Sequence, residues 1–133
     1  MNNLLNFTNI LAVGLGAALG AWGRWALNLL FNSLLPNLPL GTLIANLSGG
    51  LIMGVVLAFI AFGSFEPVGM RLFIITGFLG GLTTFSAFTG ESLTLLQKHE
   101  YCWAAIHVSS HVFGALLMAA IGYALVQYLR NTY

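Results

Sequence analysis

Charged side chains are so sparse in this chain that they leave long apolar stretches between them. The 133 residues include four Lys or Arg and three Asp or Glu, only 5% in all, whereas hydrophobic residues make up 59%. About 20 apolar residues in a helix span the hydrocarbon core of a bilayer, and soluble domains carry several times this charge. The sequence therefore predicts an all-α membrane protein with four transmembrane helices.

The predicted spans cover residues 10–31, 40–62, 69–96 and 101–129, and they form a single four-helix transmembrane domain over residues 1–133. The first span follows no basic segment and precedes no clear cleavage pattern, so we expect a retained helix rather than a signal peptide. The lone cysteine, Cys102, excludes an intramolecular disulfide. No run of basic residues indicates a nucleic-acid partner.

Orientation in a membrane normally follows the excess of Lys and Arg in short cytoplasmic loops. Four spans place Arg71 and Arg130 on one side and Arg24 and Lys98 on the other, so the count is balanced. Such a chain can insert either way up, which would allow an antiparallel dimer; the alternative is one orientation set by some other feature. Because four helices leave little room for a water-filled path, transport would favour an oligomer.

Small residues four positions apart provide faces on which helix backbones can approach closely. Such pairs occur in the first two spans: Gly16 and Gly20, Ala45 and Gly49, and Gly50 and Gly54. They predict tight helix packing, which is compatible with many membrane functions.

Polar residues inside the spans are candidates for function because they are costly in hydrocarbon. Asn46 lies one turn after Thr42, and it either makes an interhelical hydrogen bond or offers its NH2 donors to a crossing anion. Arg24 either extends to the interface or forms a positive vestibule for anions. Glu91 is an ionisable group near membrane depth and is by default a functional candidate.

The fourth span carries His107, Ser110, His111 and Gly114 on one helical face. Histidines at i and i+4 can ligate a metal or haem. Acidic partners are few, however, and only Glu91 can lie well inside a span, so an interfacial or interhelical histidine pair is the favoured interpretation. Ser110 either faces a polar path or bonds back to a carbonyl of its own helix.

The segment GFLGGLTTFSAF, residues 77–88, predicts an interruption of the third helix. Its three glycines weaken a helix, and its two threonines are restricted there by β-branching. An interrupted backbone at membrane depth is buried in protein or lines a polar cavity, and its freed carbonyls can hold a cation. Phe85 and Phe88 share a face beyond the break, where spacing alone favours core packing over edge-on contact with an anion.

Three linked motifs resemble those of the CrcB/Fluc fluoride channel family: GLGAALGAWGRW at 14–25, GTLIANLSGGLIMG at 41–54 and GFLGGLTTFSAFTGE at 77–91. The match covers three of the four spans in order. The resemblance implies a channel, not an enzyme, in the cell inner membrane that exports cytoplasmic fluoride passively and gives fluoride resistance. It also implies an antiparallel, dual-topology homodimer with two pores, each using residues of both subunits.

The resemblance further implies roles for individual residues. Asn46 would line the fluoride pore with Thr42 beside it, and the ring edges of Phe85 and Phe88 would meet the ion. Ser110, four residues before a glycine, would be the pore-lining serine of the fourth helix.

Residues outside the pore itself also receive roles from the resemblance. Arg24 and Glu91 would lie in the vestibule or around the pore. A structural sodium ion at the dimer centre would be held by the backbone carbonyls of Gly80 and Thr83.

Two positions depart from the family pattern, and two other functions compete with it. Ala87 stands where threonine is usual, and Ile106 stands where a tyrosine or another polar residue is frequent. A small multidrug exporter also has four short spans, but its chemistry resembles proton exchange on an acid in the first span, and this chain has no Asp or Glu before Glu66. A haem-binding membrane subunit would use His107 and His111.

Overall fold

The computed structural model describes residues 5–63 and 67–132. They form four helical spans: α1 (Phe7–Phe31), α2 (Leu40–Ala61), a composite third span (Val68–Gln97) and α6 (Tyr101–Thr132). Each is long and apolar enough to cross a membrane. The predicted all-α class and the count of four spans are confirmed, and every predicted boundary lies within three residues of the observed one.

The third span is interrupted and consists of α3 (Val68–Arg71), the π-helix η1 (Leu72–Leu79), α4 (Gly80–Leu82) and α5 (Phe85–Gln97). Between α4 and α5 the backbone is extended, with φ and ψ of −81° and 155° at Thr83 and of −149° and 121° at Thr84. The Thr84 hydroxyl accepts a hydrogen bond from the Ala87 amide at 3.1 Å and so caps α5. The predicted interruption is confirmed, and it falls at the two threonines rather than at the glycines.

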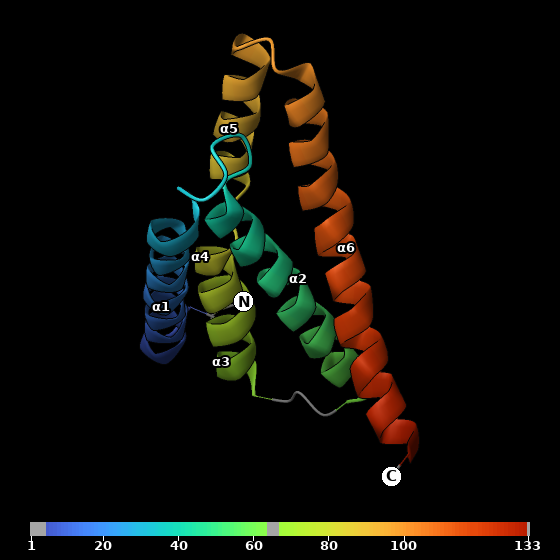
Figure 1. Cartoon of the computed structure of the whole chain (residues 1–133). Helices are drawn as coiled ribbons and strands as arrows, with labels where there is room; N and C mark the ends of the chain where they lie inside the picture. The colour runs from blue at the N-terminus through green and yellow to red at the C-terminus, as the bar shows by residue number, and fades with distance from the viewer. Residues whose placement is uncertain (1–4, 64–66, 133) are drawn as a thin grey trace.

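The helices pack in two groups that meet at the interruption (Figure 1). The first helix, α1, lies against η1 and α4, whereas α2 crosses against α6. Beyond the break, α5 and α6 form a helical hairpin at the top of the view. The break in the third span is therefore the point where elements from both groups come together.

Glycines make the closest of these helix contacts possible. On α1, a Cβ at Gly16 or Gly20 would clash with backbone carbonyls of the third span. On α2, a Cβ at Gly50 would lie 2.6 Å from the Ala115 carbonyl oxygen of α6, and one at Gly54 would clash with the next turn of α6. The small-residue spacing therefore predicted these backbone-to-backbone contacts.

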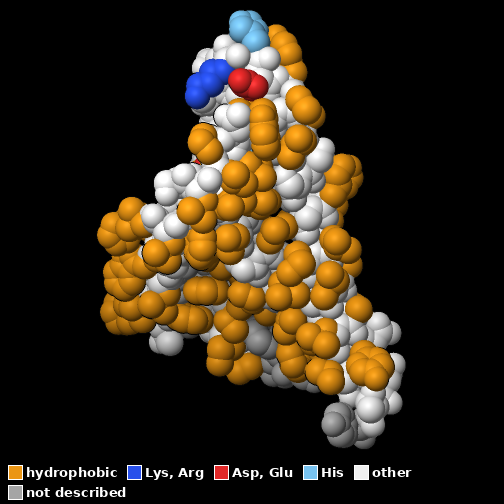
Figure 2. All heavy atoms as spheres, in the orientation of Figure 1, with side chains coloured by type: hydrophobic (Ala, Val, Ile, Leu, Met, Phe, Trp, Pro, Cys, Tyr) orange, Lys and Arg blue, Asp and Glu red, His pale blue; other side chains and the backbone are white. Residues whose placement is uncertain are grey.

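The outer surface is apolar over most of the face in Figure 2. Large hydrophobic side chains are exposed along α1 and α6, including Leu15, Trp22, Phe113 and Leu117. Basic, acidic and histidine side chains gather at the end where α5 joins α6. This distribution suits helices that are solvated by lipid along their length and by water at their ends.

Candidate functional site at the interrupted helix

The side chain of Asn46 on α2 forms hydrogen bonds with the backbone at the interruption of the third span. Its Oδ1 accepts a hydrogen bond from the Thr84 amide at 2.8 Å, and its Nδ2 donates to the Thr84 carbonyl at 3.1 Å. Thr84 is the N-cap of α5, so its carbonyl also accepts the first bond of that helix, whereas its amide depends on Asn46. The structure thus shows Asn46 in an interhelical hydrogen bond.

The same amide reaches α6. Asn46 Nδ2 lies 3.0 Å from His111 Nδ1. Because Oδ1 faces the Thr84 amide, the orientation of the Asn46 side chain is fixed and Nδ2 must be the donor. Nδ1 of His111 is then the acceptor, and the proton of the neutral ring is on Nε2.

A second polar chain runs beside the first. The Thr42 hydroxyl donates to Glu91 Oε1 at 2.6 Å, and Glu91 Oε2 lies 3.1 Å from His107 Nε2. His107 Nδ1 lies 3.1 Å from the hydroxyl of Ser92. Thr42 and His107 are fully buried, whereas the Glu91 side chain is 20% exposed. Glu91 is therefore held between α2 and α6.

Phe88 packs against both histidines. Its ring is stacked on that of His107 with centroids 5.5 Å apart, and it is tilted against His111 at 5.1 Å. Phe85 lies 5.5 Å from Phe88, as their spacing predicts, but it is 79% exposed. Phe88 is therefore half-buried against the two histidines, whereas Phe85 is exposed.

Some of these residues line a pocket of about 470 Å³, whereas Thr42, Glu91 and His107 lie outside its lining. Six candidate residues from the sequence line it: Asn46, Gly80, Thr83, Phe85, Phe88 and His111. Lining residues come from α2, from both sides of the break and from α6, and exposed Gly80 and Phe85 lie at its edge. The interruption thus borders a largely apolar pocket, into which Asn46, the two threonines and His111 bring polar groups.

Other predicted residues lie outside this pocket. The Ser110 hydroxyl donates to the carbonyls of Ile106 and His107 on its own helix. Arg24 lies on α1, which contributes no described residue to the pocket. The residue of α6 that reaches the pocket with a polar side chain is His111. The i, i+4 spacing of the histidines signalled their shared face, but not that this face meets the break.

Four helices that are long and apolar enough to cross a membrane define a multi-pass membrane protein. The sequence model of the family described as CrcB-like protein, Camphor Resistance (CrcB), matches residues 11–123, and the chain belongs to this family. It is 58% identical over 120 residues to the fluoride-specific ion channel FluC of Aromatoleum aromaticum, covering 90% of this chain and 91% of that one. It is 50% identical over 118 residues to the protein of that name from Nitrosospira multiformis, covering 89% and 92%.

Proposed function

We propose that this chain is a fluoride-selective ion channel that lets cytoplasmic fluoride leave the cell passively. The observation that carries this proposal is the 58% identity, over nine-tenths of both chains, to a protein named a fluoride-specific ion channel. A channel is not an enzyme, so the site needs to bind and release an ion without chemical change. Neither a multidrug exporter nor a haem-binding subunit is supported by these relatives.

Fluoride is small and strongly hydrated, and a channel must replace its water with other donors at each step. The proposed path offers uncharged donors: the Asn46 amide and the ring edges of Phe85 and Phe88. The Thr42 hydroxyl would join them only when its proton turns away from Glu91. Both amide hydrogens of Asn46 have partners, so fluoride would replace the contact with His111 while the contacts with Thr84 stay. Donors without full charge bind the anion without trapping it.

Three further residues, Ser110, Glu91 and Arg24, have a proposed place in or beside the fluoride path. Ser110 can join the path only if its hydroxyl turns away from the carbonyls of its own helix. Glu91 accepts the Thr42 proton and so orients that hydroxyl. Arg24 would raise the local concentration of anions at the vestibule.

A structural sodium ion is part of the proposal, and the break fits it. In a continuous helix the Thr84 amide would bond to the Gly80 carbonyl, but here that amide bonds to Asn46. The Gly80 carbonyl is thereby released on an exposed residue, and Thr83 follows in extended conformation. Backbone carbonyls freed by broken helices are suitable ligands for Na⁺. Bound sodium would supply fixed positive charge at this position.

Two carbonyls from one chain are too few for a hard cation, which takes several oxygen ligands. A second copy in the opposite orientation would supply an equivalent pair and would also cover exposed Phe85. We therefore propose an antiparallel, dual-topology homodimer with two pores, each completed by both subunits.

Fluoride efflux from liposomes that contain only the purified protein tests the function. Valinomycin lets K⁺ leave the liposomes and so removes the potential that would hold fluoride back. We expect the trapped fluoride then to leave through the protein within the dead time of the electrode, and chloride to stay trapped under the same conditions. Protein-free liposomes are the control for leak. Fluoride that stays trapped until detergent is added would reject the channel.

A further inference from the structure

The contact between His107 and Glu91 brings together two groups that both present lone pairs. Ser92 has one hydroxyl proton, which it donates to the Phe88 carbonyl at 2.8 Å. With that proton on the carbonyl, we assign His107 Nδ1 as the donor to Ser92, which leaves Nε2 of the neutral ring without a proton. An ionised Glu91 has acceptors only, yet its Oε2 lies 3.1 Å from this nitrogen. Such a pair requires a cation between its atoms, either a proton or a metal ion.

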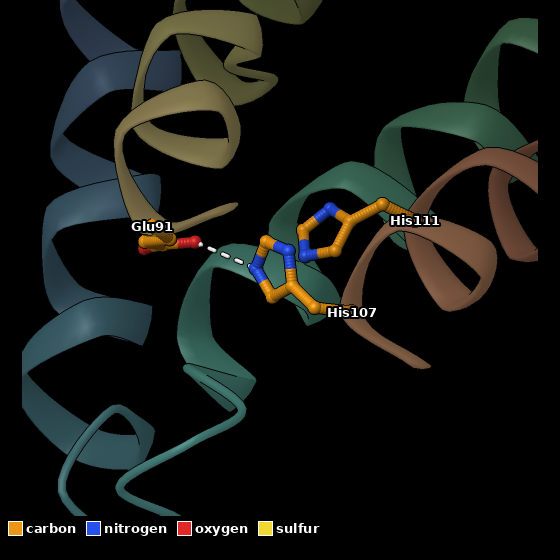
Figure 3. A group of neighbouring side chains, drawn as sticks. All are labelled: Glu91, His107 and His111. Atoms are coloured by element: carbon orange, nitrogen blue, oxygen red, sulfur yellow. Dashed lines mark hydrogen bonds and ion pairs between the residues drawn. The ribbon is translucent and has the colours of Figure 1, made fainter. Parts of the chain in front are cut away.

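A third potential ligand adjoins this pair. His111 is 4% exposed, and its Nε2 is buried without a hydrogen-bond partner among the described residues. Candidate ligand atoms of Glu91, His107 and His111 all lie within 4.8 Å of one another. In Figure 3 both imidazole rings extend from α6 toward Glu91 on α5. An unpartnered buried nitrogen next to two facing lone pairs is an arrangement that a metal ion would satisfy.

We propose that Glu91, His107 and His111 bind a divalent transition-metal ion, with Zn²⁺ as the best fit. Two histidines and one glutamate form a zinc ligand set that leaves a fourth position open. Ligand atoms around tetrahedral zinc are about 3.3 Å apart, close to the 3.1 Å between His107 Nε2 and Glu91 Oε2. The candidate ligand atom of His111 lies within 4.8 Å of the other two, so the His111 ring would move closer to them on binding.

Groups behind the ligands already hold two of them in place. The Ser92 hydroxyl fixes the His107 tautomer that leaves Nε2 free, and the Thr42 hydroxyl binds the glutamate oxygen that faces away from His107. Metal-binding histidines usually donate their other ring N–H to such a partner, which orients the ring. The side chains of Ser92 and Thr42 are therefore positioned as they would be around a metal.

Binding through His111 Nε2 requires a proton to move. The Nε2 proton leaves, Nδ1 takes up a proton, and the hydrogen bond from Asn46 to Nδ1 is lost. Asn46 keeps both of its bonds to Thr84. A proton shared by His107 and Glu91 is released to solvent as the metal enters. Metal–nitrogen bonds in zinc sites are strong enough to outweigh one amide hydrogen bond.

The metal would also affect conduction, an effect that rests on the proposed channel function. Its ligands contact Phe88 and Asn46, two residues of the proposed fluoride path. A divalent cation at this position would retain fluoride and obstruct its exit. Zn²⁺ is therefore expected to slow fluoride efflux, whereas binding itself does not depend on the channel function.

Metal binding is tested on tag-free purified protein by competition with a chromogenic zinc chelator, and by the visible absorption of bound Co²⁺. We expect one Zn²⁺ per chain and an intense four-coordinate Co²⁺ spectrum. His107→Asn and His111→Asn should each weaken binding at least about 10-fold. His99→Asn is the matched control, because His99 is exposed and contacts Tyr101 away from the site.

Size-exclusion profiles and helical circular dichroism establish that each variant is folded. Ser92→Ala keeps all three ligands and should still weaken Zn²⁺ binding by about 10-fold, because it removes the partner of His107. Equal Zn²⁺ affinity in wild type, His107→Asn and His111→Asn would overturn the proposal. So would an absence of binding in the wild type, since a proton would then be the only cation that the pair holds.

Fluoride efflux separates this proposal from the proposed function. The fluoride efflux rate with Zn²⁺, divided by the rate without it, should be about 0.1 in wild type and in His99→Asn. The same quotient should stay near one in His111→Asn. EDTA should restore the efflux rate of the inhibited proteins. Liposomes that release no fluoride before metal is added would contradict the channel, while the chelator titration would still decide the metal site. Zn²⁺ that binds but leaves the efflux rate unchanged would overturn the inhibition.

Discussion

Asn46 makes three hydrogen bonds with one amide, and they join α2, the break and α6. A buried backbone amide or carbonyl without a partner costs about 1–3 kcal/mol. Because Asn46 supplies the partner of the Thr84 amide and adds a bond to its carbonyl, it stabilises the extended segment between α4 and α5. A residue proposed for the ion path therefore also maintains the fold on which that path depends.

Asn46→Ala is expected to lower the free energy of unfolding by about 2–5 kcal/mol, because the Thr84 amide and His111 Nδ1 lose their partner. It should also reduce fluoride efflux at least about 10-fold. Thermal unfolding in detergent and the liposome assay measure the two effects. Ser48→Ala is the control on the same helix, since the Ser48 hydroxyl donates only within α2 and its loss should change stability by less than about 0.5 kcal/mol. Equal melting temperatures for the two variants would contradict the role assigned to Asn46.

At the scale of the elements, the spans could be predicted because apolar length and sparse charge act locally along the chain. The break could be predicted because glycines and β-branched threonines weaken a helix where they stand. The hydrogen-bond partners of the side chains at the break could not be predicted, because the contact of Asn46 with Thr84 depends on how α2 crosses the third span. The choice between Ser110 and His111 depends on the rotation of α6, whose sequence is apolar on most sides.

Helix spacing gives a prediction at this scale. Gly54→Ala should destabilise the protein by about 1–3 kcal/mol, because a Cβ would overlap the Ala119 carbonyl and push α2 away from α6. Gly90→Ala on α5 is the control, since nothing lies within 4 Å of a Cβ there and alanine favours helix. Thermal unfolding in detergent compares them. A Gly54→Ala protein as stable as Gly90→Ala would show that α2 and α6 do not need this close approach.

The whole molecule carries its basic residues evenly at its two ends. Arg71 closes α3 and Arg130 lies in the last turn of α6, at the end where the third span begins and the chain finishes. Arg24 and Lys98 belong to the opposite half of their spans. Because this arrangement gives no excess to either end, it selects neither orientation, as the proposed dual topology requires.

A reporter fused to the C-terminus should accordingly be found on both sides of the membrane in similar amounts. Asn131→Lys with Thr132→Lys adds two positive charges to one end, and it should direct most copies to keep that end in the cytoplasm. If antiparallel pairs are needed, efflux should fall several-fold in this variant and recover when an oppositely biased variant is co-expressed. Asn131→Gln with Thr132→Ser is the uncharged control. Reporter found on one side only in the unmodified chain would contradict dual topology.

The hydrogen bonds between Asn46 and Thr84 also have a consequence for how the chain is assembled in the membrane. The third span cannot satisfy the Thr84 amide itself and depends on a side chain of α2 for it. Because α2 comes earlier in the chain, we expect its amide to enter the bilayer before the broken segment does. The order of the helices along the sequence would then spare the newly inserted segment an unpaired peptide group in hydrocarbon, where such a group is costly.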